Sequence, residues 1–214
     1  MTGVDRYRPA DAGVPTDDGR VRSSMDGSYI RRWRQDVTAR LDRLLPGFEV
    51  RFGYPPDRHT IGGPAGEGEI ASLAGVRPPA DLLAWYREVR DVSLPDIGNG
   101  YFVHEPSLVA RSEVTSIRGR FVDDVFVFAS DGGGTLFAVG AATGSPVYRL
   151  PAGEIVADVY RSDDPLFEVV AENLIGFFDR LRDTVDAFVM TGAAGGWTAA
   201  PDISPTRIPS SSHP

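Results

Sequence analysis

The stretch DVFVFASDGGGTLFAV, residues 124–139, decides the fold that we expect for this chain. Its first part, residues 124–129, is a short apolar run rich in Val and Phe, which is typical of a buried central strand. Three consecutive glycines at 132–134 separate this run from a second β-type run at 135–139. Because glycine adopts positive φ angles without strain, the triplet predicts a hairpin between two antiparallel strands.

Further strands are expected on both sides of this hairpin. The run VYRL at 147–150 follows the breaker Gly144-Ser145-Pro146, so residues 124–150 predict a three-stranded antiparallel meander. Residues 155–160 predict an additional edge strand. Upstream, the turn cluster Gly98-Asn99-Gly100 precedes an apolar strand at 101–103. The middle of the chain is therefore predicted to form a β-sheet.

A long amphipathic helix is predicted over residues 165–189. Asp163-Asp164-Pro165 is typical of a helix start, because acids favour the positive end of the helix dipole and proline suits the first turn. Large apolar residues then recur at helical spacing and share one face, which we expect to cover the meander. The residues of this face are Leu166, Val170, Leu174, Phe177, Leu181, Val185 and Phe188.

The region before the sheet predicts further helices and one strand. Residues 29–45 carry a helical apolar stripe after a capping Ser28. FEVRFGY at 48–54 alternates apolar and polar residues, as a half-buried strand does. A short helix near 70–74 and a proline-led helix at 79–89 follow. The stripe of the first helix consists of Ile30, Trp33, Val37, Leu41 and Leu44.

These elements predict an α+β fold, with an antiparallel or mixed β-sheet packed on one side by helices, as a single domain over residues 29–190. Residues 1–28 are rich in Gly, Pro, Asp and Arg with few apolar residues, and predict a disordered lead. Residues 191–214 hold four prolines and a Ser run, and predict a flexible tail.

The charge of the chain limits its partners. Its 214 residues carry 30 acidic and 22 basic side chains, a formal net charge of −8. Residues 1–60 hold 9 acids and 11 arginines, whereas residues 61–214 hold 21 acids and 11 arginines. An acidic body disfavours nucleic acids and anionic membranes, which require a basic surface, and it attracts a basic partner. Ordinary solubility charge is the alternative interpretation.

Two missing residue types exclude several chemistries. Without cysteine the chain has no disulfide, no thiolate nucleophile and no Cys-type metal site. Every basic residue is an arginine, so there is no Schiff-base lysine and no phosphate loop of the GK[ST] type. The N-terminus lacks the apolar run of a secretion signal, so we expect a cytoplasmic protein.

No motif in the sequence selects a catalytic site. The histidines His59, His104 and His213 have no metal-ligand spacing, and no GxSxG nucleophile motif occurs. The glycines at 132–134 precede a strand instead of a helix, so they do not predict a phosphate site. We therefore expect no catalytic residue, no cofactor and no metal. A hydrolase built from dispersed carboxylates is the enzymatic alternative.

Four segments resemble, in the same order, the motifs of one family: GEIASLAGVRPPADLLAWYREV, LPDIGNGYF, VFVFASDGGGTLFAV and SPVYRL. Together they make residues 66–190 similar to the SUKH superfamily, the domain first recognised in a yeast regulator of cell-wall synthesis. The resemblance implies an α+β fold with helices on one side of the sheet, and no chemistry of its own. Many bacterial members look like immunity proteins for polymorphic toxins. The chain departs from the family at Arg77-Pro78-Pro79, where Leu-Pro is common, and residues 30–63 have no counterpart.

The resemblance and the acidic charge favour a non-enzymatic protein-binding domain, an immunity protein that neutralises a toxin by occlusion. The expected partner is a basic toxin such as a nuclease, whose anionic substrate acidic side chains would mimic. An intracellular regulatory or scaffold domain that binds a host protein is the alternative. Trp85 is either a partly exposed interface anchor or a core residue. The acidic candidates for partner binding are Asp123, Asp124, Asp131, Asp158, Asp163 and Asp164.

Overall fold

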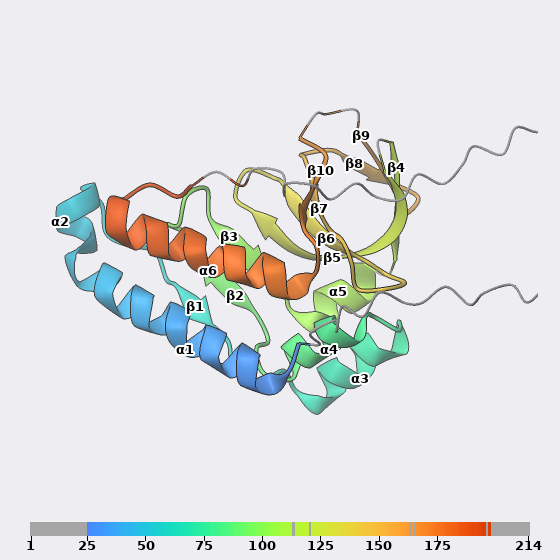
Figure 1. Cartoon of the computed structure of the whole chain (residues 1–214), viewed down its shortest axis with the longest axis horizontal. Helices are drawn as coiled ribbons and strands as arrows, with labels where there is room; N and C mark the ends of the chain where they lie inside the picture. The colour runs from blue at the N-terminus through green and yellow to red at the C-terminus, as the bar shows by residue number, and fades with distance from the viewer. Residues whose placement is uncertain are drawn as a thin grey trace, which may run out of the picture.

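Figure 1 shows the structure, a computed structural model, in which a ten-stranded mixed β-sheet is combined with helices α1 to α6. It describes residues 25–112, 114–119, 121–162, 164, 166–195 and 197. The predicted α+β fold with a mixed sheet in a single domain is confirmed. Residues 1–24 of the predicted lead and most of the predicted tail lie outside the described residues.

The long strand β5 is the centre of the sheet. β3 and β4 pair with opposite ends of one edge of β5, while β6 pairs with its other edge. The sheet continues from β3 to β2 and β1, from β4 to β9 and β8, and from β6 to β7 and β10. Among the described strands, β4 and β9 are parallel and the other pairs are antiparallel. The strands are β1 (Thr60–Ile61), β2 (Val92–Leu94), β3 (Tyr101–Val103), β4 (Thr115–Gly119), β5 (Val122–Asp131), β6 (Leu136–Gly140), β7 (Val147–Leu150), β8 (Glu154–Val156), β9 (Val159–Ser162) and β10 (Glu168–Ala171).

The meander predicted over residues 124–150 is confirmed. β5, β6 and β7 pair in antiparallel order, with Val127 opposite Ala138 and Ala138 opposite Tyr148. The hairpin between β5 and β6 passes against the turn that precedes β3, where a Cβ at Gly132 would overlap the carbonyl oxygen of Asn99. Glycine is required at this position because the two backbones approach closely.

Helices α1 and α6 lie side by side over one face of the sheet (Figure 1). The apolar stripe predicted for the first helix is buried in α1, and Trp33 Nε1 donates a 2.7 Å hydrogen bond to the carbonyl of Phe178 in α6. The cap of α1 is Asp26, and not the predicted Ser28, whose hydroxyl donates to the Asp26 carboxylate. The helices are α1 (Gly27–Leu44), the 3-10 turn η1 (Leu45–Gly47), α2 (Phe48–Phe52), α3 (Glu67–Gly75), α4 (Ala80–Tyr86), α5 (Pro106–Ser112) and α6 (Leu174–Thr191).

The strand predicted at 48–54 is wrong, because the segment forms α2 instead. Phe48 and Phe52 are four residues apart, so they share a helix face, and their ring centroids lie 4.4 Å apart. Phe52 also stacks on Phe188 of α6, with ring centroids at 5.2 Å. Gly53 ends α2 in the left-handed conformation, with φ 81°. The segment fits both the strand and the helix periodicity, and contact with α6 favours the helix.

The predicted start of the last helix is also wrong. α6 begins at Leu174, capped by Asn173, whose side chain accepts a 2.9 Å hydrogen bond from the amide of Gly176. The residues before it form β10, which pairs with β7, as β-branched valines favour. From Leu174 onward the predicted apolar residues of the stripe are buried, whereas Leu166 is 47% exposed.

The single edge strand predicted over 155–160 is instead a hairpin. Ala157 and Asp158 take left-handed backbone conformations, with φ 48° and 61°, and join β8 to β9. β9 pairs with β4, so β8 becomes the last strand on this side of the sheet.

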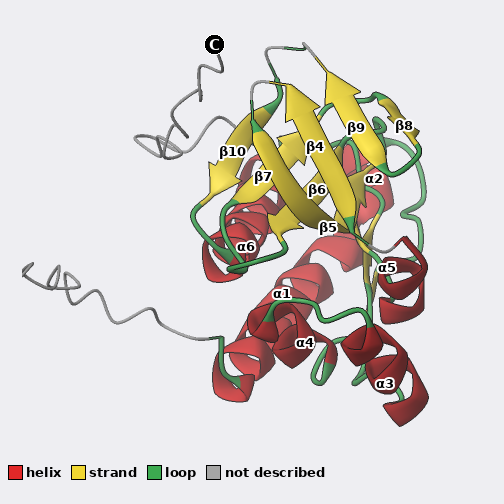
Figure 2. Ribbon diagram, turned by 90° about the vertical axis from the view of Figure 1, so that its right-hand side faces the viewer, coloured by secondary structure: helices red, strands yellow, loops and turns green. Residues whose placement is uncertain are grey.

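The face of the sheet turned away from α1 and α6 is buried by the sheet itself. The strands curl, as Figure 2 shows, and enclose a second apolar core. Tyr160 of β9 contacts Phe167, next to β10, with ring centroids 5.7 Å apart, and Phe121 contacts Tyr148 of β7 at 5.5 Å. The helices predicted on one side are therefore complemented by self-packing on the other. This core consists of Ile117, Val125, Val127, Ala138, Tyr148, Leu150, Tyr160, Phe167 and Val169.

Candidate protein-binding surface

Strands β5, β4, β9 and β8 form a section whose register shows which side chains point outward. Ile117 and Tyr160 are fully buried and occupy one cross-strand row that faces the second core. Side chains alternate between the two faces of a sheet, so the flanking rows point the other way. We call these two rows the outer face: Val122, Arg118, Arg161 and Glu154 in one, and Asp124, Ser116, Val159 and Val156 in the other.

The outer face is exposed to solvent. It continues the face of β5 that the helices cover at Phe126 and Phe128, but β4, β8 and β9 project beyond α1 and α6 (Figure 1). Val122 is 63% exposed and Val156 is 58% exposed. Of the nine exposed large apolar side chains among the described residues, Val122 and Val156 lie on the outer face, and Val114 lies beside it in the hollow next to Val122. Exposed apolar side chains rimmed by polar groups are typical of an interaction site.

Two shallow hollows mark the outer face. One, of ≈ 470 Å³, lies between Val122, Arg118 and Asp124 and the residues Ala141 and Ala142. The other, of ≈ 530 Å³, lies over Val156, Val159 and Arg161. Each hollow combines valine methyl groups with a guanidinium group, so it can receive an apolar side chain beside an acidic or polar group of a partner.

Charged side chains on the outer face are held by short-range contacts. Asp124 accepts a 2.6 Å hydrogen bond from the hydroxyl of Ser116, and a guanidinium nitrogen of Arg118 lies 3.7 Å from the same carboxylate. Arg118 also donates to the backbone carbonyls of Ile117 and Asp123. These contacts fix the two charges on the strands, so a partner meets them already ordered.

Two of the acidic residues predicted from the sequence lie on or beside the outer face. Asp124 belongs to it, and Asp158 lies in the β8–β9 turn beside it, where its carbonyl accepts a 2.7 Å hydrogen bond from the amide of Ser116. Asp123 points to the opposite face and accepts a 2.8 Å hydrogen bond from the hydroxyl of Tyr148. Burial, and then this bond to Asp123, raise the pKa of Tyr148 above its ordinary range.

The other predicted acids do not join this group. Asp131 lies at the far end of β5, about 30 Å from Val122 at ~3.3 Å per residue. Its carboxylate accepts hydrogen bonds from the amides of Gly133 and Thr135, so it holds the hairpin turn. Asp164 is exposed and accepts from the amide of Leu166. Asp163 lies outside the described residues.

Trp85 is not an interface anchor. It is fully buried, and its ring stacks on Phe178, so the prediction of a partner-binding Trp85 is wrong and the core alternative is right. The short helix α4 has its inward side against α1, α6 and the sheet, and Leu82, Trp85 and Tyr86 are all buried there. A partner that binds the protein surface could not contact this indole.

The two described histidines stabilise local structure. The side chain of His59 is buried, and its Nε2 lies 2.9 Å from the Asp96 carboxylate, which also accepts from the amide of Asp57. His104 Nε2 lies 2.9 Å from the Ser130 hydroxyl, and burial lowers the pKa of His104.

Metal binding finds no support in the described part of the chain. Within the ranges that the structure describes, no three His, Asp or Glu side chains are grouped closely enough to hold a metal ion. Likewise, no helix among the described residues is long and apolar enough to cross a bilayer.

The chain matches no family model, and no curated protein matches it significantly.

Sequence reasoning missed the apolar half of the outer face. Val122 and Val156 lie in β-type runs, where valine is as typical of a core as of a surface. Their exposure follows from the register of β4, β8 and β9, and the available signal was the presence of the charged residues Asp123, Asp124 and Glu154 in the same short runs.

Proposed function

We propose that this chain is a non-enzymatic, cytoplasmic protein-binding domain, an immunity protein that neutralises a basic toxin by occlusion. The observation that carries the proposal is the outer face, where Val122 and Val156 are exposed among charged side chains. An apolar patch rimmed by polar groups is typical of protein–protein interaction sites. The resemblance of residues 66–190 to the SUKH superfamily supports the immunity role.

The valines supply the apolar part of the interface. Burial of apolar surface contributes about 25 cal/mol per Å². Val122 on β5 and Val156 on β8 are held in one sheet with β4 and β9 between them, and valine loses little rotamer freedom when it is covered. A partner that covers both therefore gains burial with a small entropy cost.

The charges orient the partner. Asp124, Asp158 and Glu154 are exposed and lie on β5, in the β8–β9 turn and on β8, in the section of the sheet that also contains β4 and β9. A basic toxin would pair with them, and the net charge of −8 would accelerate encounter at low salt. Exposed charges at the rim of an interface act mainly on association rate and specificity, so the affinity depends on the valines.

The edge of the sheet offers a further contact. β8 is the last strand of its branch among the described strands, so its outer backbone groups are open to a strand from the partner. Ile155 and Val156 of this strand are 42% and 58% exposed. A partner seated on the outer face would extend naturally over β8.

Site-specific photo-cross-linking in the native cell tests the proposal. A photoreactive amino acid at position 122 or 156 is expected to capture the same protein. The control position is Val50, which is 95% exposed on α2 and lies away from the outer face. Capture from position 50 alone, or from none of the three, would contradict the outer face as the binding surface.

The activity of the captured protein then separates the two candidate functions. For an immunity protein, the captured protein is toxic when expressed alone, and one equivalent of this chain abolishes its enzymatic activity. A captured host protein that is not toxic and keeps its activity would favour the regulatory or scaffold function instead.

A further inference from the structure

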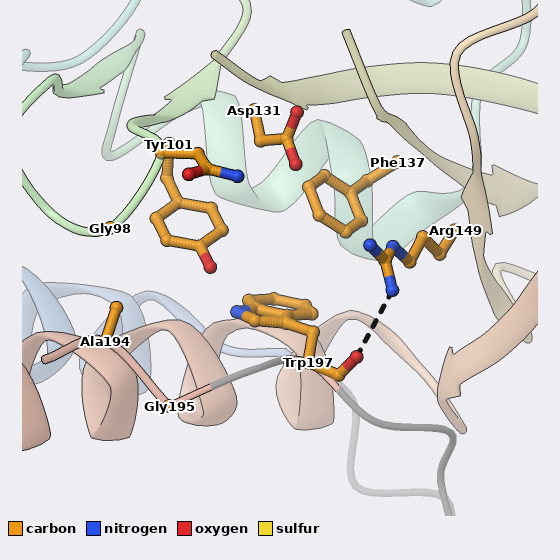
Figure 3. Close-up of a pocket in the computed structure, with 9 residues that line it drawn as sticks. Gly98, Tyr101, Asp131, Phe137, Arg149, Ala194, Gly195 and Trp197 are labelled. Carbon is orange, nitrogen blue, oxygen red and sulfur yellow. Dashed lines mark hydrogen bonds between the residues drawn. The ribbon is translucent and has the colours of Figure 1, made fainter. Parts of the chain in front are cut away.

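Trp197 lies in an aromatic recess near the Asp131 end of β5, whereas the outer face lies at the Val122 end of this strand. Its ring centroid is 4.9 Å from those of Phe137 and Phe177 and 5.6 Å from that of Tyr101, on which it stacks. The guanidinium carbon of Arg180 lies 5.4 Å over the indole. Trp197 is only 8% exposed, although it follows the end of α6 by six residues. Figure 3 shows the ring packed against those of Tyr101 and Phe137.

The backbone of the same segment is recognised at two further points. Arg149 Nη1 donates a 3.3 Å hydrogen bond to the carbonyl oxygen of Trp197 (Figure 3). At Gly98, an added Cβ would lie 2.8 Å from the Cβ of Ala194, so the segment passes closely over a glycine. The recess therefore recognises an indole, the carbonyl of the same residue, and a small residue three positions before it.

The chain's own segment does not fill this recess completely. A cavity of ≈ 160 Å³ is left between the segment and the body, and Asn99, Asp131 and Arg149 contribute polar groups to its wall. The indole N–H of Trp197 is buried beside the hydroxyl of Tyr101. The unfilled volume leaves room for a ligand that makes more contacts in the recess than Trp197 does.

We propose that this recess is a peptide-binding site for a tryptophan-bearing segment of a partner protein, and that Trp197 occupies it as an intramolecular competitor. The ligand has a small residue three positions before its tryptophan, because a larger side chain would collide with Gly98. Its tryptophan carbonyl binds Arg149. The tether gives Trp197 a high effective concentration, so a partner segment binds only when it fits better or when Trp197 leaves. This site is separate from the outer face and does not depend on it.

Peptide binding to a full-length Trp197→Gly variant tests the proposal. The probe is the octapeptide AAGGWTAA, the sequence of residues 193–200. Isothermal titration is expected to show saturable one-to-one binding to the variant and at least tenfold weaker binding to the wild-type chain. A peptide with alanine in place of tryptophan should not bind, and leucine at the position of Ala194 should weaken binding at least tenfold.

A second measurement keeps the test decisive if the variant is destabilised. In the wild-type chain labelled with 5-fluorotryptophan, excess peptide is expected to displace Trp197 and shift its fluorine resonance, while those of the buried Trp33 and Trp85 stay unchanged. The proposal is overturned if a folded Trp197→Gly variant does not bind the peptide, or if the wild-type chain binds it equally well. It is also overturned if excess peptide leaves the Trp197 resonance in place.

Discussion

The indole of Trp85 lies flat against the ring of Phe178, with 3.4 Å between ring centroids and 6° between ring planes. Trp33 meets both rings edge-on, at 5.0 Å from Trp85 and 5.6 Å from Phe178. These three aromatic residues come from α4, α6 and α1, so one cluster joins the helices that cover the sheet. The helical layer should depend strongly on this contact.

Replacement of Trp85 by alanine should destabilise the protein strongly. Removal of a fully buried aromatic side chain leaves a cavity and costs about 3–5 kcal/mol of unfolding free energy. Urea denaturation followed by circular dichroism measures this change. Val50→Ala is the matched control, because Val50 is exposed and should change stability by less than about 0.5 kcal/mol. A loss below about 1 kcal/mol for Trp85→Ala would contradict the packing described.

Two adjacent glycines in the β5–β6 turn should differ in their tolerance of alanine. A Cβ at Gly132 would overlap the Asn99 carbonyl, whereas at Gly133 the nearest atom is a side-chain oxygen of Asp131 at 3.3 Å. We expect Gly132→Ala to cost about 1–3 kcal/mol as the two turns are forced apart, and Gly133→Ala to cost less. Equal melting temperatures for the two variants would show that the turns do not touch in this way.

The buried pair of His59 and Asp96 should be sensitive to loss of the carboxylate. Asp96→Ala leaves His59 Nε2 and the amide of Asp57 without their acceptor, which should cost about 1–3 kcal/mol. Asp57→Asn is the control, since Asp57 contributes its backbone amide and its side chain is exposed. Chemical denaturation at pH 7 compares the two, and a near-neutral Asp96→Ala would refute a structural role for the pair.

The protein should become less stable as the pH decreases, because of the titration of His104. Burial lowers the pKa of His104 below its ordinary 6.5, so the unfolded chain takes up this proton at a higher pH than the folded one. The contribution of His104 to the free energy of unfolding is therefore fully present above pH 6.5 and decreases below it. His104→Gln should reduce the difference between pH 7.5 and 5.5, while His213→Gln should not. An unchanged pH dependence in His104→Gln would exclude this linkage.

Local patterns were sufficient to predict the β5–β7 meander and most of the first helix. The apolar run at 124–129 and the glycines that follow it admit few alternatives, and they form β5 and its hairpin. The stripe of α1 has helical spacing that no strand can satisfy. In contrast, Phe48 and Phe52 fit both a strand and a helix, and Phe188, far along the chain, decides for α2.

The candidate site could not be predicted from local sequence patterns, because it depends on contacts between distant parts of the chain. The outer face exists because β4 pairs in parallel with β9, a non-local pairing that sets which valines are exposed. Trp85 adjoins a predicted apolar stripe, but α4 is enclosed widely enough to bury it as well. The acidic residues were identified by charge alone, and only the register shows that Asp124 and Asp158 are neighbours while Asp131 is distant.

The affinity of the captured partner for outer-face variants tests the central claim most directly. Val122→Arg and Val156→Arg together replace the exposed apolar groups by charges that repel a basic partner, and Val50→Arg is the control on α2. With circular dichroism spectra unchanged, the account predicts at least a hundredfold rise in Kd for the double variant and less than a twofold change for the control. A double variant that binds and inhibits the partner as the wild-type chain does would contradict it.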